Sequence, residues 1–260
     1  SKICIVTGGT SGIGLAISKA LLGRGAAVYA VGFPQDSVDA AKEELSGYDR
    51  ARAVLVDVTD YEQVQGIVDR AVEEKGRLDY MFNNAGTGAT VPFEVLTLDH
   101  WKQIMDLNVW GVIYGVHAAF HVMLKQGGGH IVNTASVAGL MPPPYQAAYC
   151  ATKYAVVGLT EALRYEHAHR GIYFSVPCPF NVATAIFGDA PPPDDAISAE
   201  EAAEHILAGV ERREGIIVFP EHEKERLMRW KSEPREKTDA EFLKMADERR
   251  KAFETTGRYY

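Results

Sequence analysis

A tyrosine and a lysine stand four residues apart, at Tyr149 and Lys153, in a stretch with helical periodicity. Residues at this spacing project from one face of a helix, so the phenol and the ammonium should lie about one turn apart. Ser136 precedes them by a short loop, and Asn108 lies midway along an earlier helical stretch. A phenol beside an ammonium can exchange a proton with a bound hydroxyl, because the positive charge favours the phenolate. The pair alone is a weak indication, since such pairs are also common on helix surfaces.

A glycine-rich segment, Thr7-Gly8-Gly9-Thr10-Ser11-Gly12-Ile13-Gly14, follows the first strand-like run and leads into a helical one. Glycines let the backbone turn tightly and approach a pyrophosphate, and the helix N-terminus offers free N–H groups. The spacing differs from Gly-x-Gly-x-x-Gly, and the segment lacks the Lys-Ser/Thr ending of a P-loop. It therefore predicts a dinucleotide as the ligand.

Two further strand ends should meet the same crevice, because ligands of open α/β sheets bind beyond the carboxyl ends of the strands. Asp57 ends the third expected strand, where its carboxylate could accept a hydrogen bond from an adenine amino group, and Val58 follows it. Asn83-Asn84-Ala85-Gly86 ends the fourth, where small residues let a ribose come close. Each segment could instead be a turn or a cap, and Asp57 is an obvious capping candidate.

Together these residues suit hydride transfer between a secondary alcohol and a nicotinamide. The reaction needs a base for the hydroxyl proton, and free tyrosine, with a pKa of about 10, is too protonated at neutral pH. Lys153 and the positive nicotinamide both favour the phenolate of Tyr149. We expect Ser136 to hydrogen-bond the substrate oxygen and Asn108 to hold a water that passes the proton onward.

The elements that position these residues alternate between short apolar runs and longer helical patterns, as in βαβ units. The apolar runs are nearly continuous, as strands covered on both faces require. Strands are expected at about 3–6, 27–31, 53–56, 78–82, 130–135, 172–176 and 216–219. The order predicts an α/β fold, a doubly wound parallel sheet (Rossmann fold) in a single domain, with residues 1–220 as its dinucleotide-binding catalytic part.

With these motifs in order, the sequence resembles the short-chain dehydrogenase/reductase family. Thr-Gly-x-x-x-Gly-x-Gly is present at 7–14 and Asn-Asn-Ala-Gly at 83–86, and the family's tetrad is present as Asn108, Ser136, Tyr149 and Lys153. The resemblance spans roughly residues 1–219. It implies an NAD(P) cofactor, a small-molecule substrate, and assembly into homodimers or homotetramers through the two long helices. The expected cofactor-binding residues are Gly8, Thr10, Ser11, Gly12, Ile13, Gly14, Gly32, Phe33, Asp57, Val58, Asn84, Ala85, Gly86, Tyr149, Lys153, Pro179, Val182 and Thr184.

The sequence departs from the family pattern after the sixth strand. The family usually carries Pro-Gly followed by a Val and a Thr, whereas this chain reads Pro179-Phe180-Asn181-Val182-Ala183-Thr184. Phe180 replaces the glycine beside which the nicotinamide normally lies. Its side chain is therefore expected to tilt that ring or to line the substrate pocket.

The end of the second strand bears on the choice between NAD and NADP. Enzymes that prefer NAD usually place an acid there, and those that prefer NADP place Arg or Lys nearby. Here the turn reads Val31-Gly32-Phe33-Pro34-Gln35-Asp36, with no acid at Gly32 and no base at Phe33 or Ser11. Because a phosphate would meet no repulsion at Gly32, the sequence favours NADP(H) slightly.

The expected walls of the substrate pocket are mostly apolar or aromatic, without a clustered Arg or Lys that could bind a carboxylate or phosphate. They are Thr90, Val91, Val137, Met141, Tyr145, Phe180, Ile186 and Phe187. We predict a hydrophobic ketone or secondary alcohol as substrate, cyclic or aromatic in structure.

Composition argues against several other classes. The formal net charge of −8 gives no positive field for nucleic acid. The cysteines Cys4, Cys150 and Cys178 are odd in number and lack C-x-x-C spacing, which disfavours both a disulfide framework and a zinc site. We expect no apolar run to approach the roughly 20 residues of a membrane span. We therefore expect a cytoplasmic enzyme with no metal and no membrane partner.

Two segments interrupt the pattern. Residues 183–196 form a long loop with three consecutive prolines, which could be a lid over the site or a plain surface connection. Residues 221–260 are strongly charged, with Phe242, Met245, Ala246 and Phe253 at helical spacing. We expect a helical extension of the same domain, packed either on a neighbouring subunit or on its own domain.

Two alternatives to the oxidoreductase remain. A non-catalytic, dinucleotide-binding regulatory protein is conceivable because of Phe180. A sugar-nucleotide epimerase or dehydratase of the longer branch of the family is less favoured, since the glycine spacing differs and a large second lobe is lacking.

Overall fold

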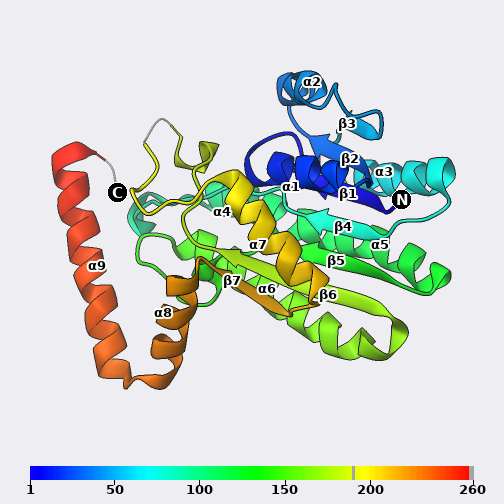
Figure 1. Ribbon diagram of the computed structural model, residues 1–260. Helices are drawn as coiled ribbons and strands as arrows, with labels where there is room; N and C mark the ends of the chain where they lie inside the picture. The colour runs from blue at the N-terminus through cyan, green and yellow to red at the C-terminus, as the bar shows by residue number, and fades with distance from the viewer. Residues whose placement is uncertain (189–190, 258–260) are drawn as a thin grey trace.

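The structure is a computed structural model, and it describes residues 1–188 and 191–257. Seven parallel strands form one sheet in the order β3-β2-β1-β4-β5-β6-β7. The strands are β1 Ile3–Thr7, β2 Ala27–Gly32, β3 Ala51–Leu55, β4 Tyr80–Asn83, β5 Gly129–Asn133, β6 Ile172–Pro179 and β7 Ile216–Phe219. Helices cover both faces of the sheet (Figure 1), which confirms the predicted doubly wound α/β fold.

The helices are α1 Gly12–Gly23, α2 Gln35–Glu44, α3 Tyr61–Lys75, α4 Leu98–Met105, α5 Gly111–Gln126, α6 Ala147–His167, α7 Ala199–Glu211, α8 Glu221–Ser232 and α9 Arg235–Thr256. Buried side chains divide into two apolar cores. One contains Ile17 of α1 and Ile206 of α7, and the other contains Val68 of α3, Met123 of α5 and Val156 of α6. The sheet separates these two layers, so its central strands are buried on both faces and mainly apolar.

The strand order reverses beside β1, with β2 and β3 on one side and β4 to β7 on the other. At such a switch point, the loops that follow neighbouring strands diverge and leave a crevice at the carboxyl edge. Thr7, the last residue of β1, joins the two strand ends there. Its Oγ1 accepts hydrogen bonds from the backbone N–H groups of Asn84 at 3.0 Å and Ala85 at 3.1 Å.

Helices α4 and α5 form one continuous helix, Leu98–Gln126, through a π-helical turn at Asp106–Trp110. This helix is long and apolar enough to cross a membrane, so the expectation that no stretch has that character was wrong. Half of its most apolar window is buried, and α5 packs against α3, β4 and β5. Those contacts are typical of the core helix of a doubly wound fold.

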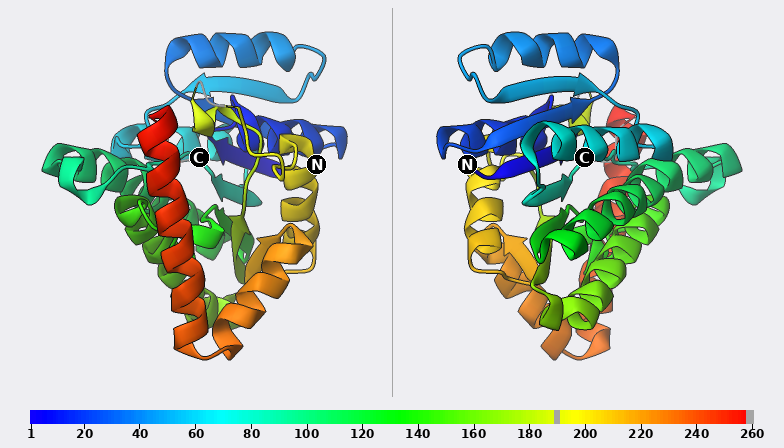
Figure 2. Two further views of the ribbon diagram at one scale, coloured as in Figure 1. Left: turned by 90° about the vertical axis from the view of Figure 1, so that its left-hand side faces the viewer. Right: turned by 90° about the vertical axis from the view of Figure 1, so that its right-hand side faces the viewer.

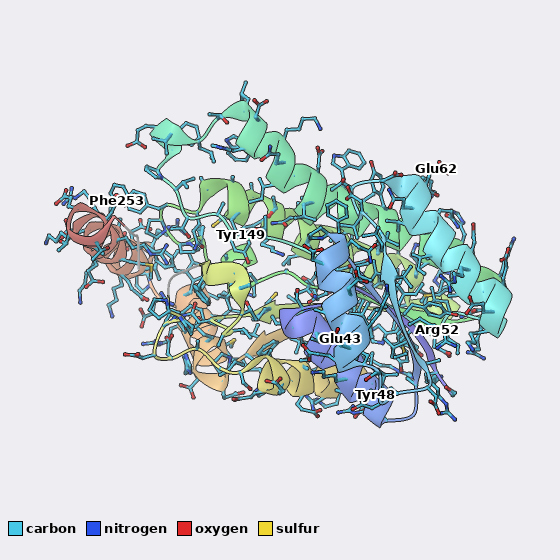
Figure 3. All side chains as sticks on the ribbon, turned by 90° about the horizontal axis from the view of Figure 1, so that it is seen from above. Glu43, Tyr48, Arg52, Glu62, Tyr149 and Phe253 are labelled. Carbon is cyan, nitrogen blue, oxygen red and sulfur yellow. The ribbon has the colours of Figure 1, made fainter. Side chains whose placement is uncertain are left out.

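After β7 the chain forms two helices, α8 and α9, where one was expected. Pro234 is the N-cap residue of α9, and a proline there ends the preceding helix because it has no N–H to donate. Helix α9 stands apart from the two helical layers, beside the carboxyl ends of the strands (Figures 1 and 2). Seen from above, Tyr149 lies between α9 and the sheet (Figure 3). Residues 189–190 of the expected loop and 258–260 of the expected extension lie outside the described residues.

Candidate active site

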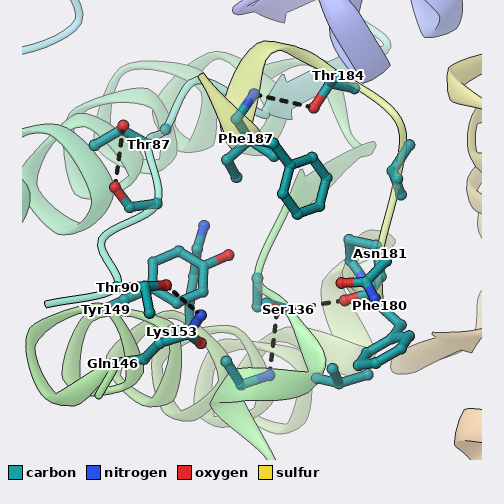
Figure 4. Close-up of a pocket in the computed structure, with 18 of the residues that line it drawn as sticks. Thr87, Thr90, Ser136, Gln146, Tyr149, Lys153, Phe180, Asn181, Thr184 and Phe187 are labelled. Carbon is teal, nitrogen blue, oxygen red and sulfur yellow. Dashed lines mark hydrogen bonds between the residues drawn. The ribbon is translucent and has the colours of Figure 1, made fainter. Parts of the chain in front are cut away.

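One cavity of about 490 Å³ opens at the carboxyl ends of β1, β4, β5 and β6. Ser136, Tyr149 and Lys153 all line it, so the structure brings together three residues that the sequence placed in one catalytic set. The hydroxyl of Tyr149 points into the space that Ser136 faces from the other side (Figure 4). This arrangement leaves room for a small molecule between the phenol and the serine hydroxyl.

Lys153 is buried on α6, one turn after Tyr149. Its Nζ donates a hydrogen bond to the carbonyl oxygen of Thr134 at 3.1 Å and lies 5.5 Å from the centroid of the Tyr149 ring. Burial lowers the pKa of Lys153 to about 8, because the ammonium loses its hydration. At pH 7 the group therefore remains mainly a cation, held beside the phenol.

Ser136 follows β5 and begins a short 3-10 turn at Val137–Gly139. Its Oγ accepts a hydrogen bond from the N–H of Ala138 at 3.1 Å and donates one to the carbonyl oxygen of Pro179 at 3.3 Å. The first bond fixes the position of the oxygen. The second is long, so the hydroxyl hydrogen can turn toward a substrate oxygen at little cost.

Asn108 lies in the π-helical turn between α4 and α5 and is fully buried. Its Oδ1 accepts from the N–H of Thr87 at 2.9 Å, and its Nδ2 donates to the carbonyl oxygen of Thr87 at 2.9 Å and to Thr152 Oγ1 at 3.2 Å. Asn108 thus ties the segment after β4 to α6, the helix of Tyr149. Its expected role in holding a water stays a prediction.

The glycine-rich turn has the close packing that a phosphate cradle requires. Gly8 has a φ of +63°, and a Cβ on it would lie 3.0 Å from Ala85 Cα. A Cβ on Gly14 would lie 2.1 Å from the carbonyl oxygen of Gly8. Ser11, the N-cap residue of α1, makes no side-chain capping bond, so the first N–H groups of this helix are available to an anion. These residues fit the pyrophosphate of a dinucleotide.

Most of the expected cofactor-binding residues line this cavity. They are Gly8, Ser11, Gly12, Ile13, Asn84, Ala85, Gly86, Tyr149, Lys153, Pro179, Val182 and Thr184. Six others lie elsewhere: Thr10, Gly14, Gly32, Phe33, Asp57 and Val58. Gly14 packs beneath Gly8, and Phe33 is 63% exposed beyond the end of β2. A cofactor role stays a prediction for all eighteen residues, and for these six the cavity gives it no support.

Asp57 lies two residues beyond β3 and not at its end. Its Oδ1 accepts hydrogen bonds from the N–H of Thr59 at 2.9 Å and from Thr59 Oγ1 at 2.7 Å. The carboxylate therefore stabilises the turn before α3, which is the structural role that the sequence left open. The capping residue of α3 itself is Asp60, whose side chain accepts from the N–H groups of Glu62 and Gln63.

Six expected substrate-pocket residues line the cavity: Thr90, Val137, Met141, Phe180, Ile186 and Phe187. Val91 and Tyr145 do not, and they instead join two loops through a 2.8 Å bond from Val91 N–H to the Tyr145 carbonyl oxygen. The ring of Phe180 turns away from the space between Tyr149 and Ser136 (Figure 4). It meets His222 of α8 edge to face, with ring centroids 6.3 Å apart.

The C-terminal helices supply cavity residues that the sequence did not assign to the site, namely Arg226, Phe242, Met245 and Arg249. Two arginines therefore line the cavity, whereas the sequence assigned none to its wall. Arg226 pairs with Glu241 at 2.9 Å, whereas Arg249 donates to the carbonyl oxygen of Pro144 at 2.6 Å. The spacing of Phe242 and Met245 signalled a buried face, but it did not show what that face covers.

Polar residues near Tyr149 complete the wall. Gln146 Nε2 donates to Thr90 Oγ1 at 2.8 Å, which links the loop after β4 to the start of α6 (Figure 4). Cys150 is buried, and burial raises its pKa to about 11, which fits a packing role. Within 1–188 and 191–257, no three His, Cys, Asp or Glu side chains gather in a way that could hold a metal ion.

This chain resembles known dehydrogenases in both sequence and structure. The family model described as short chain dehydrogenase matches residues 2–194. The 3beta-hydroxysteroid dehydrogenase 2 of Eggerthella lenta is 39% identical over 188 residues, which cover 71% of this chain and 72% of that protein. The D-threitol dehydrogenase of Mycolicibacterium smegmatis is 36% identical over 187 residues, with 71% and 72% covered. The crystal structure of a short-chain dehydrogenase/reductase from Burkholderia phymatum in complex with NAD superposes with a TM-score of 0.78 at 27% identity, covering 98% of this chain and 95% of that one.

Proposed function

The chain belongs to the short-chain dehydrogenase/reductase family of oxidoreductases, and we propose that it interconverts a hydrophobic secondary alcohol and its ketone with Tyr149 as the acid/base. One observation carries the proposal. The phenol of Tyr149 shares a cavity with the buried Lys153 ammonium and the Ser136 hydroxyl, at the edge of the sheet where the glycine-rich turn also opens.

Each side chain has a role in the proton transfer. When bound, the nicotinamide gives or accepts the hydride. In the reducing direction Tyr149 donates its hydroxyl proton to the carbonyl oxygen, and in the oxidising direction its phenolate takes the alcohol proton. The ammonium of Lys153 stabilises the phenolate. Ser136 donates a hydrogen bond to the substrate oxygen as negative charge develops on it.

The cofactor preference is proposed to be NADP(H), by a small margin. Any side chain at Gly32 would collide with Thr10, because a Cβ there would lie 2.0 Å from Thr10 Oγ1. Thr10 Oγ1 is itself 2.6 Å from Ser37 Oγ, so two hydroxyls stand near the end of β2. Hydroxyl groups can donate to a phosphate without repelling it. A kcat/KM with NADH well above that with NADPH would refute this preference.

The substrate is proposed to be hydrophobic because the cavity wall around Tyr149 is mostly apolar. The two relatives do not indicate a single substrate class, since one is named for a hydroxysteroid and the other for a sugar alcohol. Assembly into a homodimer or homotetramer is proposed through α5 and α6, where Leu124, Tyr154 and Tyr165 are exposed. The ring of Phe180 turns away from the reacting groups (Figure 4), which supports a catalytic role over a non-catalytic one.

The proposal is tested by purifying the protein and following NADPH and NADH oxidation with a panel of carbonyl compounds. The panel pairs cyclic and aryl ketones with small keto acids of similar reactivity. We expect turnover of the apolar ketones. Turnover of small anionic substrates alone would contradict the proposed substrate class. Absence of both NADPH and NADH oxidation across the whole panel would contradict the proposed activity.

A further inference from the structure

Helix α9 closes the far side of the cavity with apolar side chains. Phe242 and Met245 face the cavity, although both lie beyond residues 2–194, the part that the family model matches. Ile186 and Phe187 add apolar side chains to the same cavity from the loop after β6. A molecule held at Tyr149 and filling this cavity would therefore contact apolar side chains from both segments.

Contacts at both ends and along its length hold α9 against the domain. Arg226 of α8 pairs with Glu241 of α9 at 2.9 Å, and the rings of Trp230 and Phe242 lie 4.6 Å apart. Further along, Arg249 donates to the carbonyl oxygen of Pro144 at 2.6 Å. Phe242 and Met245 lie between these anchors. Their position relative to Tyr149 is therefore fixed by the fold, as a specificity pocket requires.

The cavity has both polar and apolar lining residues. Ser136 and Tyr149 mark the place where the carbonyl must lie, and the bonded pair Thr90–Gln146 also lines the cavity. Val137, Met141, Ile186, Phe187, Phe242 and Met245 offer apolar contacts. Two arginines also line the cavity: Arg226 pairs with Glu241 and with the buried Glu223, and Arg249 donates to the carbonyl oxygen of Pro144. An uncharged, bulky group suits the apolar residues, because apolar surface buried against them leaves water.

We propose that Phe242 and Met245 are specificity-determining residues that contact the part of the substrate farthest from the reacting carbon. The substrate class is then an uncharged ketone or secondary alcohol with at least two fused rings or an aryl substituent. Short ketones bind without these contacts and are turned over less efficiently. This inference rests on the proposed dehydrogenase activity, and it adds which side chains select the substrate.

The experiment compares 2-decalone, which has two fused rings, with cyclohexanone, which carries the same reacting group in one ring. Phe242→Ala and Met245→Ala each remove apolar contacts, so kcat/KM for 2-decalone should fall about tenfold or more. The value for cyclohexanone should change less than about twofold, because the smaller ring does not reach α9. Met245→Trp fills the cavity, and it should also reduce turnover of 2-decalone selectively.

Leu243→Ala is the matched control, because Leu243 lies on the same helix and is 71% exposed. It should leave both values unchanged. The conservative variants Phe242→Leu and Met245→Leu keep the test valid if an alanine variant unfolds, and circular dichroism shows which variants are folded. In folded variants, equal losses for both ketones, or no loss for either, would overturn the proposal. If the wild type itself reduces neither ketone nor any other panel member, the proposed dehydrogenase activity is contradicted, and so is the inference that rests on it.

Discussion

The ammonium nitrogen of Lys153 lies 5.5 Å from the centroid of the Tyr149 ring and donates a hydrogen bond to the carbonyl oxygen of Thr134. The carbonyl belongs to the residue directly after β5, and both side chains belong to α6. Strand and helix together therefore fix a cation beside the phenol. The burial of this cation affects both activity and stability.

Replacing Lys153 by methionine should reduce activity and increase stability. Without the cation, kcat/KM should fall at least about 100-fold, because the phenolate loses its stabilisation. Burial lowers the pKa of Lys153 to about 8, below its value in the unfolded chain, so at pH 7 the charge destabilises the folded state. Lys153→Met should raise the free energy of unfolding by about 1–3 kcal/mol at pH 7, and thermal melts would measure it.

The sign of the pH dependence follows from the same shift. The unfolded chain binds more protons than the folded one between about pH 8 and the unfolded pKa of about 10.5, so wild-type stability rises across this range. The gain from Lys153→Met should therefore shrink toward zero above that range. A variant less stable than the wild type at pH 7 would contradict this prediction.

The pH profile of carbonyl reduction should show the loss of the same cation. Below about pH 8 Lys153 is charged, and above it the free enzyme progressively loses the ammonium. We expect kcat/KM for reduction to fall as the pH rises through about 8, since this parameter reports groups of the free enzyme. Lys153→Arg keeps its charge at every accessible pH. If that variant retains activity, its kcat/KM should not fall as the pH rises through about 8. An unchanged fall would show that another group titrates there.

Gly14→Ala should weaken cofactor binding. The new Cβ would lie 2.1 Å from the carbonyl oxygen of Gly8, so the turn that forms the cradle must move. Gly23→Ala is the control, because it is the last residue of the same helix and no heavy atom lies within 4 Å of its added Cβ. Titration of NADPH fluorescence should show at least about tenfold weaker binding for Gly14→Ala, against little change for Gly23→Ala. Equal affinities in the two variants would mean that the turn does not hold the cofactor.

Asp79 at the opposite edge of the sheet should support folding and not catalysis. Burial opposes ionisation of this carboxylate, but bonds from the N–H of Ile3 and from Lys2 and Arg77 outweigh it and lower the pKa of Asp79. Its stabilisation is therefore present above the unfolded pKa of about 3.9 and is lost as the pH falls through the folded value. Asp79→Asn should cost about 1–3 kcal/mol at pH 7, with kcat/KM unchanged.

Urea denaturation at pH 7 and in acid would measure this cost, with the exposed Asp49→Asn as the comparison. The difference between Asp79→Asn and the wild type should narrow in acid. A cost as large in acid as at pH 7 would show that the ionised form of Asp79 is not what stabilises the fold.

The sheet and the catalytic residues could be predicted from the sequence because their signals are local. The apolar runs of β1 and β2 follow from burial on both faces, and the four-residue spacing of Tyr149 and Lys153 places them on one face of α6. The glycine-rich turn has steric requirements that few other residues satisfy. Each of these features is decided within about one turn or one strand of chain.

Features that depend on distant partners could not be predicted in the same way. The spacing of Phe242 and Met245 indicates a buried face, but only the fold shows that this face covers the cavity. Arg226 and Arg249 reach the site through the same helices and carry no local signal of it. The role of Asp57 depended on whether Thr59 would fold back onto it, and the direction of Phe180 depended on His222 of α8. Pro234, by contrast, was a local signal for the break between α8 and α9.

The most direct test of the account is kcat/KM and the cofactor dissociation constant of Tyr149→Phe, measured beside Tyr154→Phe. Tyr154 lies on the same helix and is 43% exposed, so its variant controls for losing a phenol from α6. We predict that Tyr149→Phe loses at least about 1,000-fold in kcat/KM while it binds NADPH within about threefold of the wild type, and that Tyr154→Phe changes neither value. Turnover by Tyr149→Phe within tenfold of the wild type would contradict the central claim.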